Sequence, residues 1–188
     1  LGIGGLAFAL AAQDTIKNIF GGITIFTDRP FRIGDRVKVD GFDGFVEDIG
    51  IRSTRLRTLE KRLVTIPNYK IVDASIENIS DEPMRRVVMV IGLTYGTTPE
   101  AMNEAISILK NIPKRINEVD EESLIAVFSD FAAYSLNLKL IYWIKSTGDV
   151  TEVPSKVNFE ILTAFNKAGL NFAFPTQTIL VEETAGKL

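Results

Sequence analysis

The chain of 188 residues is 46% hydrophobic and 24% charged, with a formal net charge of −3 and a pI near 5.1. This acidic balance argues against a dedicated nucleic-acid binder, whose binding surface is normally basic. The sequence contains no cysteine and no histidine, which excludes disulfides, thiolate and imidazole metal sites and histidine-based catalysis within it. No nucleophile stands beside a base in any recognisable motif, so neither an enzyme nor a cofactor is expected.

The first 32 residues set the organisation of the chain. The opening twelve are all uncharged and small or apolar, and charges first appear at Asp14 and Lys17. A lone membrane span needs about 20 predominantly apolar residues, so the opening run is too short by itself. The longer stretch carries charges that a lone span should not carry. The pattern therefore predicts a helix with one apolar face and another face on water or on copies of itself.

Small residues form one stripe of this predicted helix. They recur at i, i+3, i+7 and i+10, and they are Gly2, Gly5, Ala9 and Ala12. A stripe almost without side chains lets a second helix approach closely, which is the usual device for packing helices in lipid. A different face carries Leu6, Leu10, Gln13 and Lys17. A glycine-rich helix in a soluble core is the alternative, although glycine costs about 1 kcal/mol relative to alanine inside a helix.

Residues 35–66 change to the period-two alternation of short strands joined by tight turns, which predicts a small β-barrel-like module. The expected strands span residues 36–40, 45–49, 53–59 and 63–66. Residues 41–44 are predicted to form the first turn, because two glycines there accept a positive φ. Asn68 is expected to cap a short helix over residues 69–73, and the polar residues 80–83 mark a domain boundary.

Strands and helices alternate in the rest of the chain. A strand is predicted at residues 85–95, a helix from Thr98-Pro99 to about residue 112, and strands at 124–128 and 134–144. A second helix is expected from Thr151 to Gly169, followed by a last strand at residues 172–181. The order β-α-β-β-α-β is ferredoxin-like. An acidic loop at residues 118–122 lacks the ligand spacing of a calcium loop, so no metal site is predicted.

A basic cluster surrounds Pro30, which ends the predicted amino-terminal helix because proline cannot continue it. The cluster consists of Arg29, Arg32, Arg36 and Lys38. Basic excess beside a membrane helix marks its cytoplasmic side. A solvated surface with ordinary ion pairs is the alternative interpretation.

Several segments resemble, in order, one known family. They are GGLAFALAAQD at 4–14 with Asn18 and Gly21-Gly22 after it, RPFRIGDRV at 29–37, GFVEDIGIRSTRLRT at 44–58, VTIPN at 64–68 and IENIS at 76–80. A looser likeness continues through EPMRRV at 82–87 and FPTQTILV at 174–181. This series resembles the pore helix and cytoplasmic region of small-conductance mechanosensitive (MscS) channels.

The resemblance implies a membrane pore helix followed by a soluble α+β region. The implied parts are a kinked, pore-lining transmembrane helix (1–30), an Sm-like β domain (31–80), a ferredoxin-like α/β domain (81–175) and a strand in an intersubunit barrel with a tail (176–188). Further membrane helices would precede this segment in a multi-pass protein of the inner (plasma) membrane, with the soluble domain in the cytoplasm. The implied partners are copies of itself, seven in that family, together with membrane lipid and permeating ions, and no nucleic acid.

The resemblance also assigns roles within the first helix. Leu6 and Leu10 match the family's hydrophobic constriction, where rings of leucine one helical turn apart block ions by dewetting. Gln13 and Lys17 would line the pore. Membrane tension would tilt and separate the helices, so that ions and small solutes leave the cell under hypo-osmotic shock. Arg29, Arg32 and Arg36 would lie at the membrane interface.

A kink is expected in this helix at Gly21-Gly22. A straight helix from Leu1 to Phe26 would extend about 40 Å, at about 1.5 Å per residue, and the hydrocarbon core is only roughly 30 Å thick. Glycine pairs are identifiable sites of kinking. The alternative position is Gln13-Asp14, where some family members carry a helix-kinking glycine.

A soluble RNA-binding ring built from Sm-like and ferredoxin-like domains is the competing functional hypothesis. The acidic pI and the apolar amino-terminal stripe count against it. Tight, salt-sensitive RNA binding would favour the ring, whereas detergent-dependent solubility would favour the channel.

Overall fold

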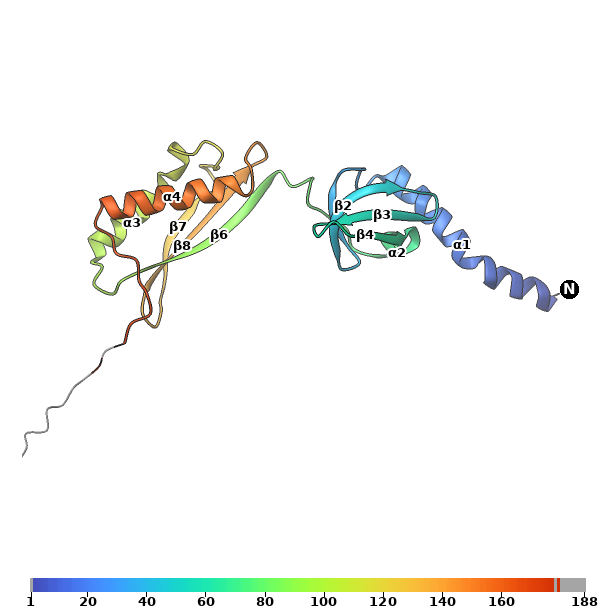
Figure 1. Ribbon diagram of the computed structural model, residues 1–188, viewed down its shortest axis with the longest axis horizontal. Coiled ribbons are helices and arrows are strands. Elements are labelled where there is room, and N and C mark those ends of the chain that lie inside the picture. The colour runs from blue at the N-terminus through green and yellow to red at the C-terminus, as the bar shows by residue number, and fades with distance from the viewer. Residues whose placement is uncertain (1, 178, 180–188) are drawn as a thin grey trace, which may run out of the picture. The chain divides into compact units, whose positions relative to one another are not determined.

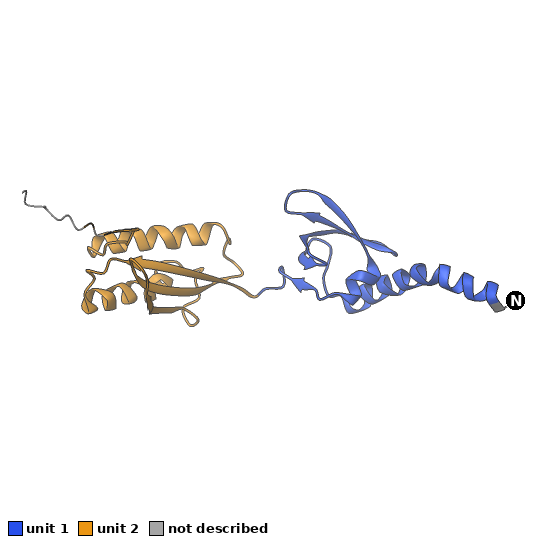
Figure 2. Cartoon of the chain, turned by 90° about the horizontal axis from the view of Figure 1, so that it is seen from below, with its two compact units in different colours: residues 1–82 blue, residues 83–188 orange. Residues whose placement is uncertain are grey.

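The computed structural model describes residues 2–177 and residue 179. The chain divides into two compact units, Leu1–Glu82 and Pro83–Leu188 (Figure 2). The first unit joins a long helix, α1 (Gly2–Asp28), to a small sheet, and the second carries helices on a separate sheet (Figure 1). Each sheet is antiparallel throughout, so the chain has a mixed α+β fold.

The sheet of the first unit has five strands in the order β4-β3-β2-β1-β5. Its strands are β1 (Arg36–Val39), β2 (Phe42–Ile49), β3 (Ser53–Thr58), β4 (Leu63–Pro67) and β5 (Glu77–Asn78). A short helix, α2 (Asn68–Asp73), connects β4 to β5. The alternating side chains of the strands meet Ile25 of α1 and Phe31 in one hydrophobic core, so the end of α1 belongs to this unit.

The first hairpin turns earlier than the sequence pattern predicted. Asp40 and Gly41 have φ values of 51° and 80°, and Val39 pairs directly with Phe42. Positive φ at both central residues is typical of the two-residue type I′ turn, whose twist matches that of the strands. The predicted turn at 41–44 is therefore wrong, and Phe42 to Gly44 belong to β2. Gly44 has another role, because a Cβ there would lie 2.5 Å from the carbonyl oxygen of Arg57 in β3.

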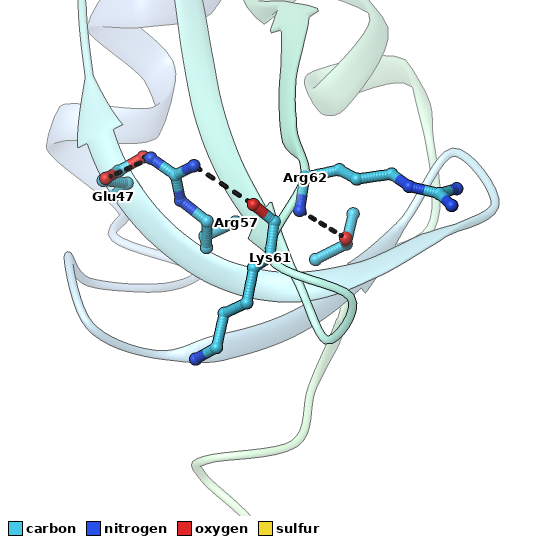
Figure 3. A network of polar contacts seen from close by, with 5 residues as sticks. Glu47, Arg57, Lys61 and Arg62 are labelled. Carbon is cyan, nitrogen blue, oxygen red and sulfur yellow. Dashed lines mark hydrogen bonds and ion pairs between the residues drawn. The ribbon is translucent and has the colours of Figure 1, made fainter.

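Polar contacts hold β3 to β2 and to the connection between β3 and β4 (Figure 3). The guanidinium of Arg57 donates to both carboxylate oxygens of Glu47, at 2.7 and 2.8 Å, and to the carbonyl oxygen of Lys61 at 3.2 Å. The backbone N–H of Arg62 donates to the hydroxyl of Thr58 at 3.2 Å. The charged tip at residues 60–62 is thus tied back onto the sheet, with Lys61 at a φ of 66°.

The second unit has a three-stranded sheet in the order β6-β8-β7. Its elements are β6 (Met84–Leu93), α3 (Pro99–Lys110), the 3-10 turn η1 (Ile112–Lys114), β7 (Ile125–Phe131), β8 (Leu136–Lys145) and α4 (Glu152–Lys167). The helix start predicted at Thr98-Pro99 is confirmed, since the Thr98 side chain accepts a hydrogen bond from the N–H of Ala101 at 3.3 Å. The core of this unit lies between the two helices and the sheet.

The predicted last strand is reduced to one bridge in the described residues. Phe172 bridges Leu93 of β6 in antiparallel fashion, and residues 173–177 have no strand structure. Pro175 has no N–H to donate to a sheet, which explains why pairing stops before it. The rest of this prediction, including the segment from Thr178 to Val181, lies outside the described residues apart from Ile179.

Candidate functional site

The amino-terminal half of α1 carries apolar side chains without a partner in the described chain. From residue 3 to residue 17 every residue of α1 is exposed apart from the half-buried Ala12. Leu6 and Leu10 are each 63% exposed. A contiguous apolar surface of this kind is typical of an interaction site. Within the described residues, no helix has both the length and the apolar character needed to cross a membrane.

Gly5 and Ala9 of the small-residue stripe of α1 are also exposed. A Cβ added at Gly5 would have no atom within 4 Å in this chain. Intramolecular packing in the described residues therefore gives no reason for glycine at this position, which is unfavourable inside a helix. The close helix–helix contact predicted for this stripe remains a prediction.

The second half of α1 presents a different face to the β-sheet unit. Asn18, Gly21 and Ile25 follow one another at helical spacing and are buried, with Asn18 at 7% and Ile25 at 1% exposure. Leu6, Leu10, Gln13 and Lys17 do not lie on this buried face. The helix is thus attached at one end and unpartnered at the other.

Gly21 and Gly22 serve this attachment. A Cβ at Gly21 would lie 2.9 Å from backbone atoms of Asn68 and Tyr69, and one at Gly22 would lie 2.5 Å from the carbonyl oxygen of Ile51. The helix runs through both residues without interruption and ends at Asp28. The helix has no break at Gly21-Gly22, and the two glycines allow its backbone to contact the start of α2 and the β2–β3 connection of the same unit. The kink predicted at this pair stays a prediction. Their role as a hinge during gating remains a prediction.

Asn68 is the buried polar centre of this contact. Its side-chain oxygen accepts from the hydroxyl of Thr54 at 2.9 Å, and its amide nitrogen donates to the carbonyl oxygens of Gly50 and Ile51 at 2.9 and 3.0 Å. The residue is fully buried. The predicted capping role is wrong, since α2 begins at Asn68 with Pro67 at the N-cap and no side-chain cap. The asparagine instead holds the β2–β3 connection against which Gly22 packs.

Asn18 joins α1 to α2 through a side-chain hydrogen bond. Its side-chain oxygen accepts from the backbone N–H of Tyr69 at 3.4 Å, and its amide donates to the carbonyl oxygen of Asp14 at 2.8 Å. The first N–H groups of a helix have no partner inside it. Asn18 therefore satisfies one of the open donors of α2 from a different helix, through a long hydrogen bond.

We expect Asn68→Ala to loosen this attachment. Three hydrogen bonds would be lost, and leaving a buried group such as the Thr54 hydroxyl unsatisfied costs about 1–3 kcal/mol. Hydrogen exchange should therefore accelerate in peptides covering residues 48–56 and 66–74, while peptides of the second unit keep their protection. Asn18→Ala is the matched comparison and should have a smaller effect, because its bond to Tyr69 is long. Equal protection in Asn68→Ala and wild type would contradict this role.

The basic residues near the end of α1 do not form a single group. Arg29 and Arg32 line a polar pocket of about 240 Å³ together with Asp35 and Asn78. Arg36 lies in β1 and forms an ion pair with Asp43 at 2.8 Å. The hydrogen bond to Asp43, which outweighs the opposing effect of burial, raises the pKa of Arg36. Arg36 therefore serves the first hairpin, and only Arg29 and Arg32 share a pocket.

Comparison with known proteins defines the class. The family model described as "Mechanosensitive ion channel, beta-domain" matches residues 14–81. The model described as "Mechanosensitive ion channel MscS, C-terminal" matches residues 87–172. The chain belongs to the MscS family of mechanosensitive ion channels, which is not a family of enzymes. The resemblance inferred from the sequence is thereby confirmed, and the RNA-binding hypothesis finds no support.

The chain is similar over nearly its whole length to two named mechanosensitive channels. The chain is 43% identical over 194 residues to the small-conductance mechanosensitive channel MscMJ of Methanocaldococcus jannaschii, covering 97% of this chain and 53% of that protein. It is 38% identical over 187 residues to the large-conductance channel MscMJLR of the same organism, covering 97% and 52%. The chain thus spans about half the length of these curated relatives. Since one is named for small and the other for large conductance, the likeness assigns no conductance.

A solved structure shares the fold. The crystal structure of Helicobacter pylori MscS in its closed state superposes with a TM-score of 0.83 at 27% sequence identity, covering 98% of this chain and 72% of that one. The sequence-based expectation of an α+β protein of MscS type is confirmed at this level.

Proposed function

We propose that this chain supplies the pore helix and cytoplasmic region of a homo-oligomeric channel that membrane tension opens, releasing ions and small solutes on hypo-osmotic shock. The observation that carries the proposal is the division of α1. Its first half is unpartnered and rich in apolar and small residues, whereas its second half is packed on the β-sheet unit through Gly21, Gly22 and Ile25. A helix held at one end can move at the other while the unit below stays folded.

Leu6 and Leu10 form the closed constriction in this proposal. They lie one helical turn apart, which is about 6 Å along the axis, so copies around a symmetry axis would form two stacked apolar rings. A neck of this kind blocks ions by dewetting. Gln13 and Lys17 continue the same face and would line the wider, polar part of the pore.

The small-residue stripe supplies the contact between pore helices. Gly2, Gly5, Ala9 and Ala12 would allow neighbouring helices to pack closely in the closed state. Tension would tilt and separate the helices, and the leucine rings would then become wet. The proposed location is the inner membrane of the cell, in a multi-pass protein with further membrane helices before this segment. The sheet units would lie in the cytoplasm, with Arg29 and Arg32 at the lipid surface.

The finer domain assignment is also a proposal. The five short antiparallel strands after α1 suit an Sm-like domain over residues 31–80. The order β6-α3-β7-β8-α4, followed by the bridge of Phe172 to β6, suits a ferredoxin-like domain over residues 81–175 with a shortened last strand. Residues 176–188 would supply a barrel strand between subunits and a tail.

Single-channel recording tests the function. The full-length protein, expressed in cells without their own tension-gated channels, should give currents that appear with suction on excised patches and vanish on its release. Patches from cells carrying the empty vector are the control. Detection of the protein in the membrane by immunoblot without any tension-activated current would overturn the proposal, as would tight, salt-sensitive RNA binding by the purified protein.

The oligomeric state is a separate expectation. Light scattering of the full-length protein in mild detergent should give a single species of several subunits, with seven as the number in the family that the sequence resembles. A monodisperse monomer would contradict the assembly. Another integer would retain the channel but reject the heptamer.

A further inference from the structure

The second unit contains a pocket with aromatic walls beside β7. It has a volume of about 460 Å³, and its lining includes Tyr95, Met102, Ile106, Phe128 and Phe131. The rings of Phe128 and Phe131 meet edge to face with centroids 4.9 Å apart, and the Tyr95 hydroxyl donates to the carbonyl oxygen of Ala132 at 2.6 Å. Among the residues that the structure describes, no charged side chain lines the pocket. Its chemistry therefore fits an apolar or aromatic side chain and not an ion.

An apolar segment of the same unit has no partner within the described chain. After the bridge at Phe172, Phe174 is 67% exposed and Ile179 is 73% exposed. Residues 173–177 form no strand. Large apolar side chains on an extended segment are suited to insertion into a pocket on another molecule.

The segment and the phenylalanine wall of the pocket lie on different strands of one sheet. Phe172 bridges β6, whereas Phe128 and Phe131 lie on β7, and the strand order β6-β8-β7 places β8 between them. The rest of the lining comes from residues 95–99 after β6, from α3 and from Leu136 of β8. At about 4.8 Å between neighbouring strands, three spacings separate the tail from β7 by roughly 14 Å.

The direction of the tail increases this separation. The N–H of Thr94 donates to Asn171 and the N–H of Ala173 donates to Gly92, at 3.1 and 2.8 Å, so the segment runs antiparallel to β6. Continuing in that direction carries Phe174 away from Tyr95, the residue of the pocket nearest to β6 in the chain. Phe174 accordingly does not line the pocket of its own subunit.

We propose that Phe174 of one copy of this chain fills the aromatic pocket of a neighbouring copy. A contact between two different surfaces of identical subunits is heterologous, and it closes into a ring when the rotation between copies permits. Aromatic rings gain from offset or edge-to-face contacts at centroid distances of about 4.5–7 Å, which the walls formed by Phe128 and Phe131 can provide. The inference rests on the proposed oligomeric channel and adds a specific contact between its cytoplasmic units.

Mixed disulfide trapping tests this contact. The sequence contains no cysteine, so only the introduced cysteines can form a disulfide within it. Phe174→Cys and Asn103→Cys, the latter at the exposed rim of the pocket on α3, are placed in separate, differently tagged full-length subunits that are co-expressed. Any cysteine outside this segment is replaced by serine. The control pairs Phe174→Cys with Lys110→Cys, which is exposed on the same helix about 10 Å further along its axis.

Mild oxidation should give covalent heterodimers with Asn103→Cys and at least tenfold fewer with Lys110→Cys. Equal yields from both pairs, or none from either while the oligomer stays intact by native mass spectrometry, would overturn the contact. A double variant that forms its disulfide only within one subunit would assign the pocket to the chain's own tail and would also overturn it. If native mass spectrometry shows a monomer, the proposed assembly fails instead, and the two failures are distinguishable.

Discussion

Leu6→Ser and Leu10→Ser are each expected to lower the tension at which the channel opens and to slow the growth of cells that express it. An apolar neck stays dry because its surface cannot bind water, and serine hydroxyls would let water and ions occupy it. Burying a leucine side chain contributes about 1.5–3 kcal/mol, and the loss is repeated in every subunit of the ring. The effect is measured as the suction that opens the variant divided by the suction that opens a coexpressed reference channel in the same patch. This ratio should be lower for the variant than for the wild type.

Phe8→Ser is the matched control for these variants. Phe8 lies within the same two turns of α1 and is 76% exposed, but it is not on the face that carries Leu6 and Leu10. Its threshold should stay much closer to that of wild type. Wild-type thresholds for both leucine variants would remove these residues from the gate, and an equal shift in Phe8→Ser would show that the effect is not specific to one face.

The sequence predicted local structure well where a segment is fixed by its own neighbours. The alternation at residues 36–39 and 53–58 gives strands at those positions, and Thr98-Pro99 starts α3 as its capping chemistry requires. The first turn was misplaced because two glycines attracted the prediction to residues 41–44. Gly44 is required for contact with β3, and Asp40 takes one of the positive φ values instead. Asp-Gly is a preferred dipeptide of the type I′ turn, so the signal for the correct position was present at Asp40-Gly41.

Residues with partners far along the chain could not be interpreted from local pattern. Gly21-Gly22 was predicted as a kink, and Asn68 as a cap, because nothing nearby in the sequence shows that they meet. One signal was available: glycine inside a helix is unfavourable and needs a packing reason. That argument was applied to the first glycines of α1, and applied to Gly21 and Gly22 it would have predicted close contact with a second element.

The carboxyl-terminal segment illustrates a third limit. Its apolar residues, Phe172, Phe174 and Ile179, read as a strand, yet only Phe172 pairs with β6 in the described residues. Pro175 interrupts the backbone donors that a ladder needs. Apolar character alone does not distinguish a strand within the subunit from a surface that binds another copy.

Gly22→Ala is expected to weaken the attachment of α1 to the β-sheet. Alanine favours the helix by about 1 kcal/mol. Its Cβ, however, would lie 2.5 Å from the carbonyl oxygen of Ile51 and 2.8 Å from the amide nitrogen of Asn68, so backbone must move. Overpacking of this kind typically costs about 1–3 kcal/mol, which exceeds the gain in helix propensity.

The consequence for gating follows from where the strain falls. The β2–β3 connection and Asn68 would be displaced, so the pore helix would lose its fixed position on the sheet unit after opening. We therefore expect slower or incomplete recovery after sustained suction, with a smaller change in the first opening threshold, and faster hydrogen exchange at residues 48–56. Gly4→Ala is the matched control, since a Cβ there has no atom within 4 Å in this chain. If Gly22→Ala recovers and exchanges like wild type, then the close contact at Ile51 does not control the position of α1, and a hinge at the glycine pair must be sought in a different state of the channel.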